Sequence, residues 1–78
     1  MDREAVLLDY VKNELLRGRA NGITVEDDLL GAGLIDSLGI LQIVAFVDER
    51  FNIQIPDEDV VYENFNSVKA LSDYLAQY

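Results

Sequence analysis

Apolar residues recur at helical spacing near the start of the chain. Intervals of three and four residues place them on one face of a helix. The stripe consists of Leu7, Leu8, Val11, Leu15 and Leu16. Asp2 is a residue type that favours the N-cap, and Gly18 with the polar residues 19–22 is typical of a helix end. The pattern predicts a first helix from about residue 3 to Arg17.

A second helix is predicted from Ser37 to Arg50, with Ser37 as its N-cap. At about 100° per residue the apolar residues spread over one broad side, which we expect to face the core. This side holds Leu38, Leu41, Val44, Val47 and Phe51. The opposite side holds Gly39, Gln42, Phe46 and Glu49. Phe46 lies among polar residues and is therefore predicted to contact a partner rather than the core. The alternative is that the short third helix covers its ring through Val61 or Tyr62.

The last third of the chain predicts a short helix and a longer one. Residues 51–56 alternate apolar and polar, but a single short strand makes no sheet, so we expect an extended segment. Asp57 is predicted to cap a brief helix from Glu58 to about Tyr62, with Val60 as its buried residue. Ser67 or Asn66 caps the last helix. Its stripe is Val68, Leu71, Leu75 and Tyr78.

A long loop, residues 18–36, separates the first two helices. Loops of this length in small domains are usually functional or disordered. Here apolar residues recur along it, and we expect them to anchor it to the core: Ile23, Val25, Leu29, Leu30, Leu34 and Ile35. Thr24 is predicted to cap a short turn over residues 25–28.

The predicted fold is all-α, a small helical bundle of three longer helices and one short helix, forming a single domain over residues 1–78. With 78 residues, 50% of them hydrophobic, the chain is large enough for one small core. The N-terminus lacks the pattern of a signal peptide. No apolar run approaches the roughly 20 residues that span a bilayer. We therefore expect a soluble, cytoplasmic monomer without membrane insertion.

The residue types exclude most catalytic sites. The chain contains no cysteine and no histidine, so it has no Ser-His-Asp triad, Cys-His pair or His/Cys zinc site. The acidic run 57–59 is followed by Val61 and by no glycine, unlike a calcium-binding loop. Gly31-Ala32-Gly33 lacks the Gly-Lys-Ser/Thr of a nucleotide-binding loop. We therefore expect no enzyme and no metal site.

The negative charge is concentrated in the middle of the chain. The net charge is −9, and residues 20–64 contain ten of the 15 acidic residues but one of the six basic residues. Such a surface repels nucleic acid and anionic membranes and attracts basic protein surfaces. The same acids would also simply favour solubility.

The segment around Ser37 is the candidate for chemistry. Gly31 and Gly33 are expected to make the loop flexible, and Leu34 and Ile35 to anchor it to the core. A helix is predicted to begin at Asp36-Ser37. The free N–H groups of a helix N-terminus favour a phosphate nearby. Ser37 as a hydrolase nucleophile is disfavoured, because the elbow motif lacks its first glycine and the chain has no histidine to act as the base.

Asp36-Ser37-Leu38 at the start of a second helix resembles the acyl carrier and peptidyl carrier proteins. The long first loop with its buried leucine, the Phe-x-Ile-x-Ile-Pro run from Phe51 and the amphipathic last helix extend the resemblance over essentially the whole chain. The resemblance implies that Ser37 receives a covalent 4′-phosphopantetheine arm from coenzyme A. Asp36 would help to position the transferase, or simply cap the helix, and Leu38 matches the motif leucine.

The resemblance also implies the partners: a phosphopantetheinyl transferase, an adenylating ligase or acyltransferase, and downstream acyl-processing enzymes. The predicted partner face is Gly39, Gln42, Phe46 and Glu49. Fatty-acid carriers usually line this face with acids, which this chain largely lacks. We therefore expect a carrier of secondary metabolism, of polyketide or nonribosomal peptide type. The alternatives are a fatty-acid or D-alanyl carrier, and a non-covalent acidic interaction module.

Overall fold

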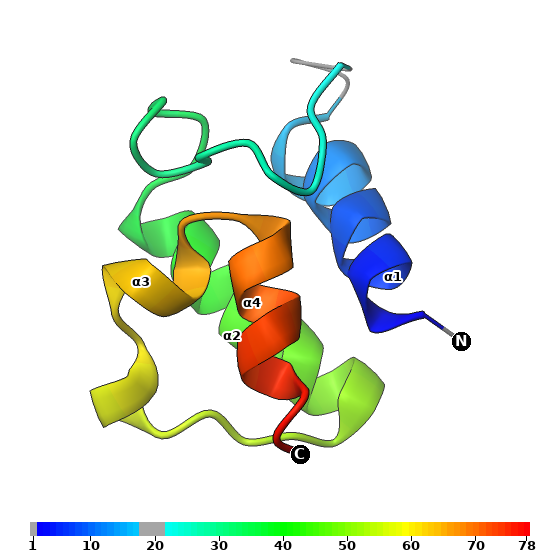
Figure 1. Cartoon of the computed structure of the whole chain (residues 1–78), viewed down its shortest axis with the longest axis vertical. Coiled ribbons are helices and arrows are strands. Elements are labelled where there is room, and N and C mark those ends of the chain that lie inside the picture. Colours follow the sequence, from blue (N-terminus) through cyan, green and yellow to red (C-terminus); the bar gives the residue numbers. More distant parts are fainter. Residues whose placement is uncertain (1, 18–21) are drawn as a thin grey trace.

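The computed structural model describes residues 2–17 and 22–78 (Figure 1). Its elements are α1 (Arg3–Tyr10), which continues as the π-helical turn η1 (Val11–Leu15), then α2 (Ser37–Phe51), the 3₁₀ turn η2 (Asp57–Asp59), α3 (Tyr62–Phe65) and α4 (Val68–Leu75). No strand occurs within these two ranges. The predicted all-α bundle is confirmed. The predicted stop of the first helix at residues 18–21 lies outside the described residues.

The helices pack around one core, with α1 alongside α4 (Figure 1). The Arg3 guanidinium donates a hydrogen bond to the Leu75 carbonyl at 2.7 Å, which joins the start of α1 to the end of α4. The Tyr10 ring stacks on Phe46 with centroids 4.0 Å apart, which joins α1 to α2. The core residues are Leu7, Val11, Leu16, Ile23, Leu29, Ile35, Ile43, Val47, Ile53, Ile55, Phe65, Val68, Leu71 and Leu75.

The first and last helices follow the sequence pattern closely. Asp2 caps α1 by accepting from the Glu4 amide at 3.0 Å, and Ser67 caps α4 by accepting from the Ala70 amide at 3.0 Å. The predicted α4 stripe is buried except at its end, because Tyr78 lies beyond the helix and is exposed. Its ring packs edge-on against Tyr74 instead, at 5.8 Å.

The predicted core side of α2 is confirmed at Val47 but wrong at Leu38 and Leu41, because the buried stripe is rotated by roughly one residue, or about 100°. Gly39, Ile43 and Val47 face the core at intervals of four residues, whereas Leu38 and Leu41 are 63% and 62% exposed. On the buried side the loop approaches α2 closely, since a Cβ added at Gly39 would lie 3.1 Å from the Ile35 Cβ, and Tyr10 of α1 stacks on Phe46. The apolar residues of α2 extend beyond this buried stripe, so apolar spacing alone does not identify it.

Phe46 is half-buried rather than exposed, which corrects its predicted position. It stacks on Tyr10 and contacts Phe51 edge-on at 6.1 Å. The ring therefore contributes to the packing of α1 against α2. A role of its remaining surface in partner binding stays a prediction.

The predicted third helix is displaced and divided. The 3₁₀ turn η2 ends at Asp59, and α3 begins only at Tyr62. Two β-branched residues, Val60 and Val61, separate them, and such residues disfavour helical backbone. Val60 is half-buried, and Phe65 is the buried side chain of α3. The preceding segment is extended as predicted, with Ile53 and Ile55 in the core.

No helix within residues 2–17 and 22–78 is long and apolar enough to cross a membrane.

Candidate functional site

Ser37 is the first residue of α2, and its side chain is exposed. The predicted N-cap is shifted by one position, because Asp36 has the extended backbone of a cap and its Oδ1 accepts from the Gly39 amide at 3.1 Å. Asp36 thus satisfies one of the free N–H groups of the helix. The Ser37 hydroxyl is left outside the capping interaction, beside the positive end of the helix dipole.

The loop before Ser37 is fixed to the core by its main chain. The amides of Leu34 and Ile35 both donate to the Leu29 carbonyl, at 2.9 and 3.1 Å. The Leu29 amide in turn donates to the Asn66 carbonyl at 2.7 Å, which ties the loop to the segment between α3 and α4. Gly33 has a φ of 74°, a conformation that favours glycine. The loop therefore presents Ser37 from a defined position, and the predicted anchors Leu29 and Ile35 are buried.

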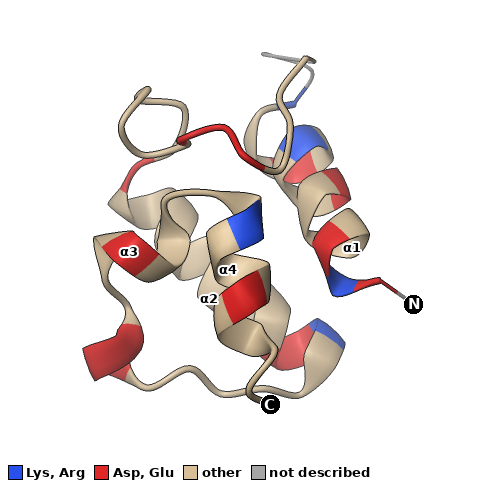
Figure 2. Cartoon of the chain, in the orientation of Figure 1, with Lys and Arg blue, Asp and Glu red and all other residues tan. Residues whose placement is uncertain are grey.

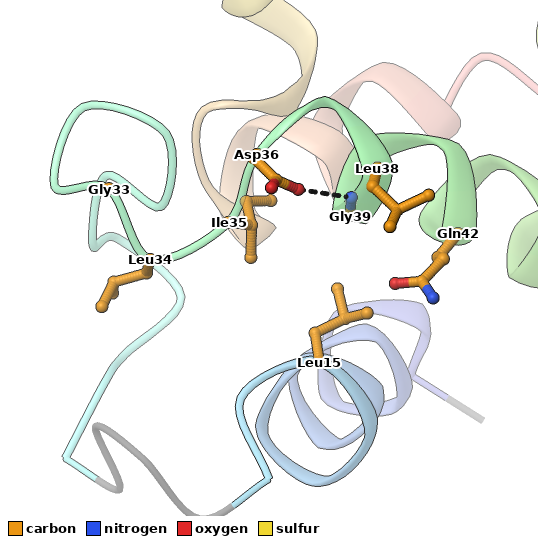
Figure 3. Close-up of a pocket in the computed structure, with 8 residues that line it drawn as sticks. All are labelled: Leu15, Gly33, Leu34, Ile35, Asp36, Leu38, Gly39 and Gln42. Carbon is orange, nitrogen blue, oxygen red and sulfur yellow. Dashed lines mark hydrogen bonds between the residues drawn. The ribbon is translucent and has the colours of Figure 1, made fainter.

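A hollow of about 250 Å³ lies beside Ser37, between η1, the loop and the first turns of α2 (Figure 3). It is lined by Leu15, residues 33–36, Leu38, Gly39 and Gln42. We call it the α1–α2 hollow, because η1, which supplies Leu15, continues α1. Leu15 points from η1 toward Leu38 and Gln42, which point back from α2 (Figure 3). Both chain neighbours of Ser37, Asp36 and Leu38, belong to its lining.

The exposed surface of α2 near Ser37 carries no charge. Residues 37–47 contain no acidic or basic residue, and acids return at Asp48 and Glu49. Figure 2 shows acids on the loop, on η2 and on α3, around this uncharged stretch. A partner that docks at the start of α2 thus meets apolar and amide groups with acids at the margin.

The structure separates the residues that the sequence grouped into a partner face. Gln42 and Glu49 are exposed, whereas Gly39 is buried and Phe46 is half-buried. A Cβ added at Gly39 would lie 3.1 Å from the Ile35 Cβ, so this glycine permits close packing of the loop on α2. The exposed face instead comprises Leu38, Leu41, Gln42, Ala45 and Glu49.

Sequence reasoning missed Leu15 and Leu41 as members of the site surface. For Leu41 the sequence did contain a signal. Ile35, Gly39, Ile43 and Val47 recur at intervals of four residues and form the buried stripe, and Leu41 lies outside this series. No comparable signal pointed to Leu15, because its place in the hollow depends on how α1 packs against α2.

A tyrosine–carboxylate pair links the loop to α3. The Tyr62 hydroxyl donates to Asp28 Oδ2 at 2.6 Å, and the Gly31 amide donates to Oδ1 at 2.7 Å. The hydrogen bonds from Tyr62 and Gly31 hold the pKa of the Asp28 carboxyl below its usual value. The same hydrogen bond raises the pKa of the Tyr62 hydroxyl.

We expect the Tyr62→Phe substitution to lower the melting temperature at neutral pH and to lose this effect in acid. The folded-state pKa of Asp28 is depressed, so its contribution is present above its unfolded pKa of about 4 and disappears as the pH falls through the lower folded value. Thermal unfolding of both proteins between neutral pH and strong acid measures the difference.

The matched control for this substitution is Tyr10→Phe. The Tyr10 hydroxyl donates to the main-chain oxygen of Gln42 at 3.3 Å, and this acceptor does not titrate. Its effect on the melting temperature should therefore stay constant over the acid range. A Tyr62→Phe effect that is equally constant would contradict the assigned linkage.

Comparison with known proteins gives a consistent result. A family model described as "Phosphopantetheine attachment site" matches residues 5–75. An acyl carrier protein from Syntrophobacter fumaroxidans is 42% identical over 67 residues, which cover 86% of this chain and 72% of that protein. A D-alanyl carrier protein from Streptococcus suis is 32% identical over 71 residues, which cover 91% and 87%.

The fold has a counterpart among solved structures. A chain from a structure described as "Crystal structure of FAD-dependent dehydrogenase" matches with a TM-score of 0.83 and 28% identity, over 90% of this chain and 99% of that chain. The chain therefore belongs to the family of carrier proteins that hold a covalent 4′-phosphopantetheine group, carry acyl groups on it and leave the catalysis to other enzymes.

Proposed function

We propose that Ser37 is the attachment site, and that the chain carries acyl or aminoacyl groups as thioesters for a secondary-metabolite pathway. The main support for this attachment site is the position of Ser37. It is the exposed first residue of α2 and directly follows a loop that is hydrogen-bonded to the core. The arm supplies a terminal thiol for the thioester.

The local structure fits an attached phosphodiester. The helix N-terminus places partial positive charge at Ser37, and no acidic residue occurs in the first turn of α2. Asp36 is engaged as the N-cap, with its Oδ1 on the Gly39 amide. In the attachment reaction, the Ser37 oxygen forms a bond to the pantetheine-bearing phosphorus of the coenzyme A diphosphate. The bond from this phosphorus to the bridging oxygen breaks, adenosine 3′,5′-bisphosphate leaves, and the hydroxyl proton passes to a base of the transferase.

Intact mass spectrometry tests the attachment. The protein is incubated with coenzyme A, Mg²⁺ and a broad-specificity phosphopantetheinyl transferase. We expect a gain of one phosphopantetheine group, which peptide fragmentation places on Ser37. No gain in mass would favour the alternative of a non-covalent acidic interaction module.

The uncharged start of α2 supports a cargo drawn from an adenylating ligase rather than from bulk fatty-acid synthesis. Recognition there relies on Leu38, Leu41 and Gln42 and should depend little on salt, because apolar contact is not screened. The relatives named acyl carrier and D-alanyl carrier proteins support those two functions as alternatives.

We therefore expect slow loading of the arm-bearing protein by a fatty-acid malonyl transferase. Loading by a ligase encoded beside it, with ATP and candidate amino or carboxylic acids, should be faster and nearly independent of salt. The loaded mass is followed at low and raised salt for both enzymes. Fast malonyl loading that falls steeply with salt, without ligase loading, would favour a fatty-acid carrier.

A further inference from the structure

We infer that the α1–α2 hollow is the resting site of the arm on the free protein, with Leu15, Leu38 and Gln42 as its contacts. This inference rests on the proposed attachment at Ser37. It assigns a function to a surface outside the bundle core, formed by residues far apart in the sequence.

The hollow lies directly beside the attachment residue. The two chain neighbours of Ser37, Asp36 and Leu38, both line the hollow. Its opposite wall is Leu15, which η1 directs toward Leu38 and Gln42 (Figure 3). A flexible chain attached at Ser37 thus begins at the rim of this hollow.

The residues that line the hollow match the chemistry of the arm. A phosphopantetheine arm combines a dimethyl-substituted apolar section with two amide groups. The hollow offers the apolar side chains Leu15, Leu34 and Leu38, and Gln42 brings an exposed amide that both donates and accepts hydrogen bonds. Leu38 is 63% exposed without a ligand, so covering it removes apolar surface from water.

Leu41 provides a matched control on the same helix. It is 62% exposed, almost the same as Leu38, but it is not part of the lining. Truncating either leucine removes the same apolar surface from α2. Only Leu38→Ala removes a wall of the hollow.

The test uses protein labelled with ¹³C and ¹⁵N and carrying an unlabelled arm without cargo. Isotope-filtered NOE spectra then detect arm protons that lie close to protein methyl groups. We expect contacts from the arm to the methyl groups of Leu15 and Leu38. In Leu38→Ala the contacts to Leu15 should be lost, whereas in Leu41→Ala they should persist.

Three results would overturn the inference. In the wild type these are an arm that makes no contacts to Leu15 and an arm that contacts Leu41 instead. In the Leu38→Ala protein it is the persistence of the contacts to Leu15. A hollow that serves only a partner's side chain would give the first of these. Should Leu38→Ala accept the arm poorly, Leu15→Ala, which leaves the Asp36-Ser37-Leu38 motif unchanged, must abolish the contacts to Leu38.

The mass spectrum separates this inference from the function on which it rests. Absence of the arm from the wild-type mass contradicts the attachment at Ser37. Presence of the arm without contacts in the hollow contradicts the resting site alone.

Discussion

The Ser37→Ala protein should fold normally and gain no phosphopantetheine under conditions in which the wild type is fully converted. The substitution removes the one hydroxyl that lies at the start of α2 beside the loop. It leaves the fold intact because Asp36, not Ser37, caps the helix, and because alanine readily adopts helical backbone. Intact mass and far-UV circular dichroism together measure loading and folding.

Ser67→Ala and Ser72→Ala are the controls, and both should still be loaded. The Ser67 Oγ accepts from the Ala70 amide as the N-cap of α4, so its loss costs stability, about 1 kcal/mol, without touching the attachment site. Ser72 lies within α4 and is half-buried. A Ser37→Ala protein that still gains the arm would show that the attachment residue is wrongly assigned.

The elements that could be predicted are those in which local pattern and tertiary packing agree. In α4 the intervals between Val68, Leu71 and Leu75 match a helix that buries one stripe, and all three are in the core. The loop anchors Ile23, Leu29 and Ile35 could also be predicted, because the apolar residues of a surface loop are shielded from water only where they pack against the core.

The orientation of α2 could not be predicted, because apolar residues surround most of the helix. Both the stripe through Leu38 and Leu41 and the stripe through Gly39 and Ile43 are consistent with the sequence. The structure has the second stripe in the core, with Tyr10 of α1 stacked on Phe46 and Ile35 of the loop packed close to Gly39. The site depends on these contacts, since this orientation of α2 leaves Leu38 exposed beside Ser37.

The Phe65→Ala protein should be the least stable of the variants considered, with a loss of about 3–5 kcal/mol. Phe65 is 1% exposed and is the buried side chain of α3. Natural domains have roughly 0.05–0.15 kcal/mol of stability per residue, so a chain of 78 residues has about 4–12 kcal/mol in total. The loss is therefore a large part of the whole. Urea unfolding followed by circular dichroism measures it.

Val61→Ala is the control for the effect of truncating a side chain in this region. Val61 precedes α3 and is 42% exposed, so its truncation leaves no cavity and should change stability by about 0.5 kcal/mol or less. A similarly small loss in Phe65→Ala would contradict the assignment of Phe65 to the core.

The effect of Phe65→Ala should extend to the loop before Ser37. The carbonyl of the next residue, Asn66, accepts a hydrogen bond from the Leu29 amide at 2.7 Å. The Leu29 carbonyl in turn accepts hydrogen bonds from the amides of Leu34 and Ile35. Phe65 is buried in the core next to Asn66 and thereby helps to fix the position of the Asn66 carbonyl.

Amide hydrogen exchange measures this effect. Under conditions in which the Phe65→Ala protein remains mostly folded, exchange at Leu29, Leu34 and Ile35 should be faster than in the wild type. In Val61→Ala these amides should exchange at the wild-type rate, because the Asn66 carbonyl keeps its position. Unchanged exchange in a destabilised Phe65→Ala protein would mean that the loop is held by its own apolar anchors alone.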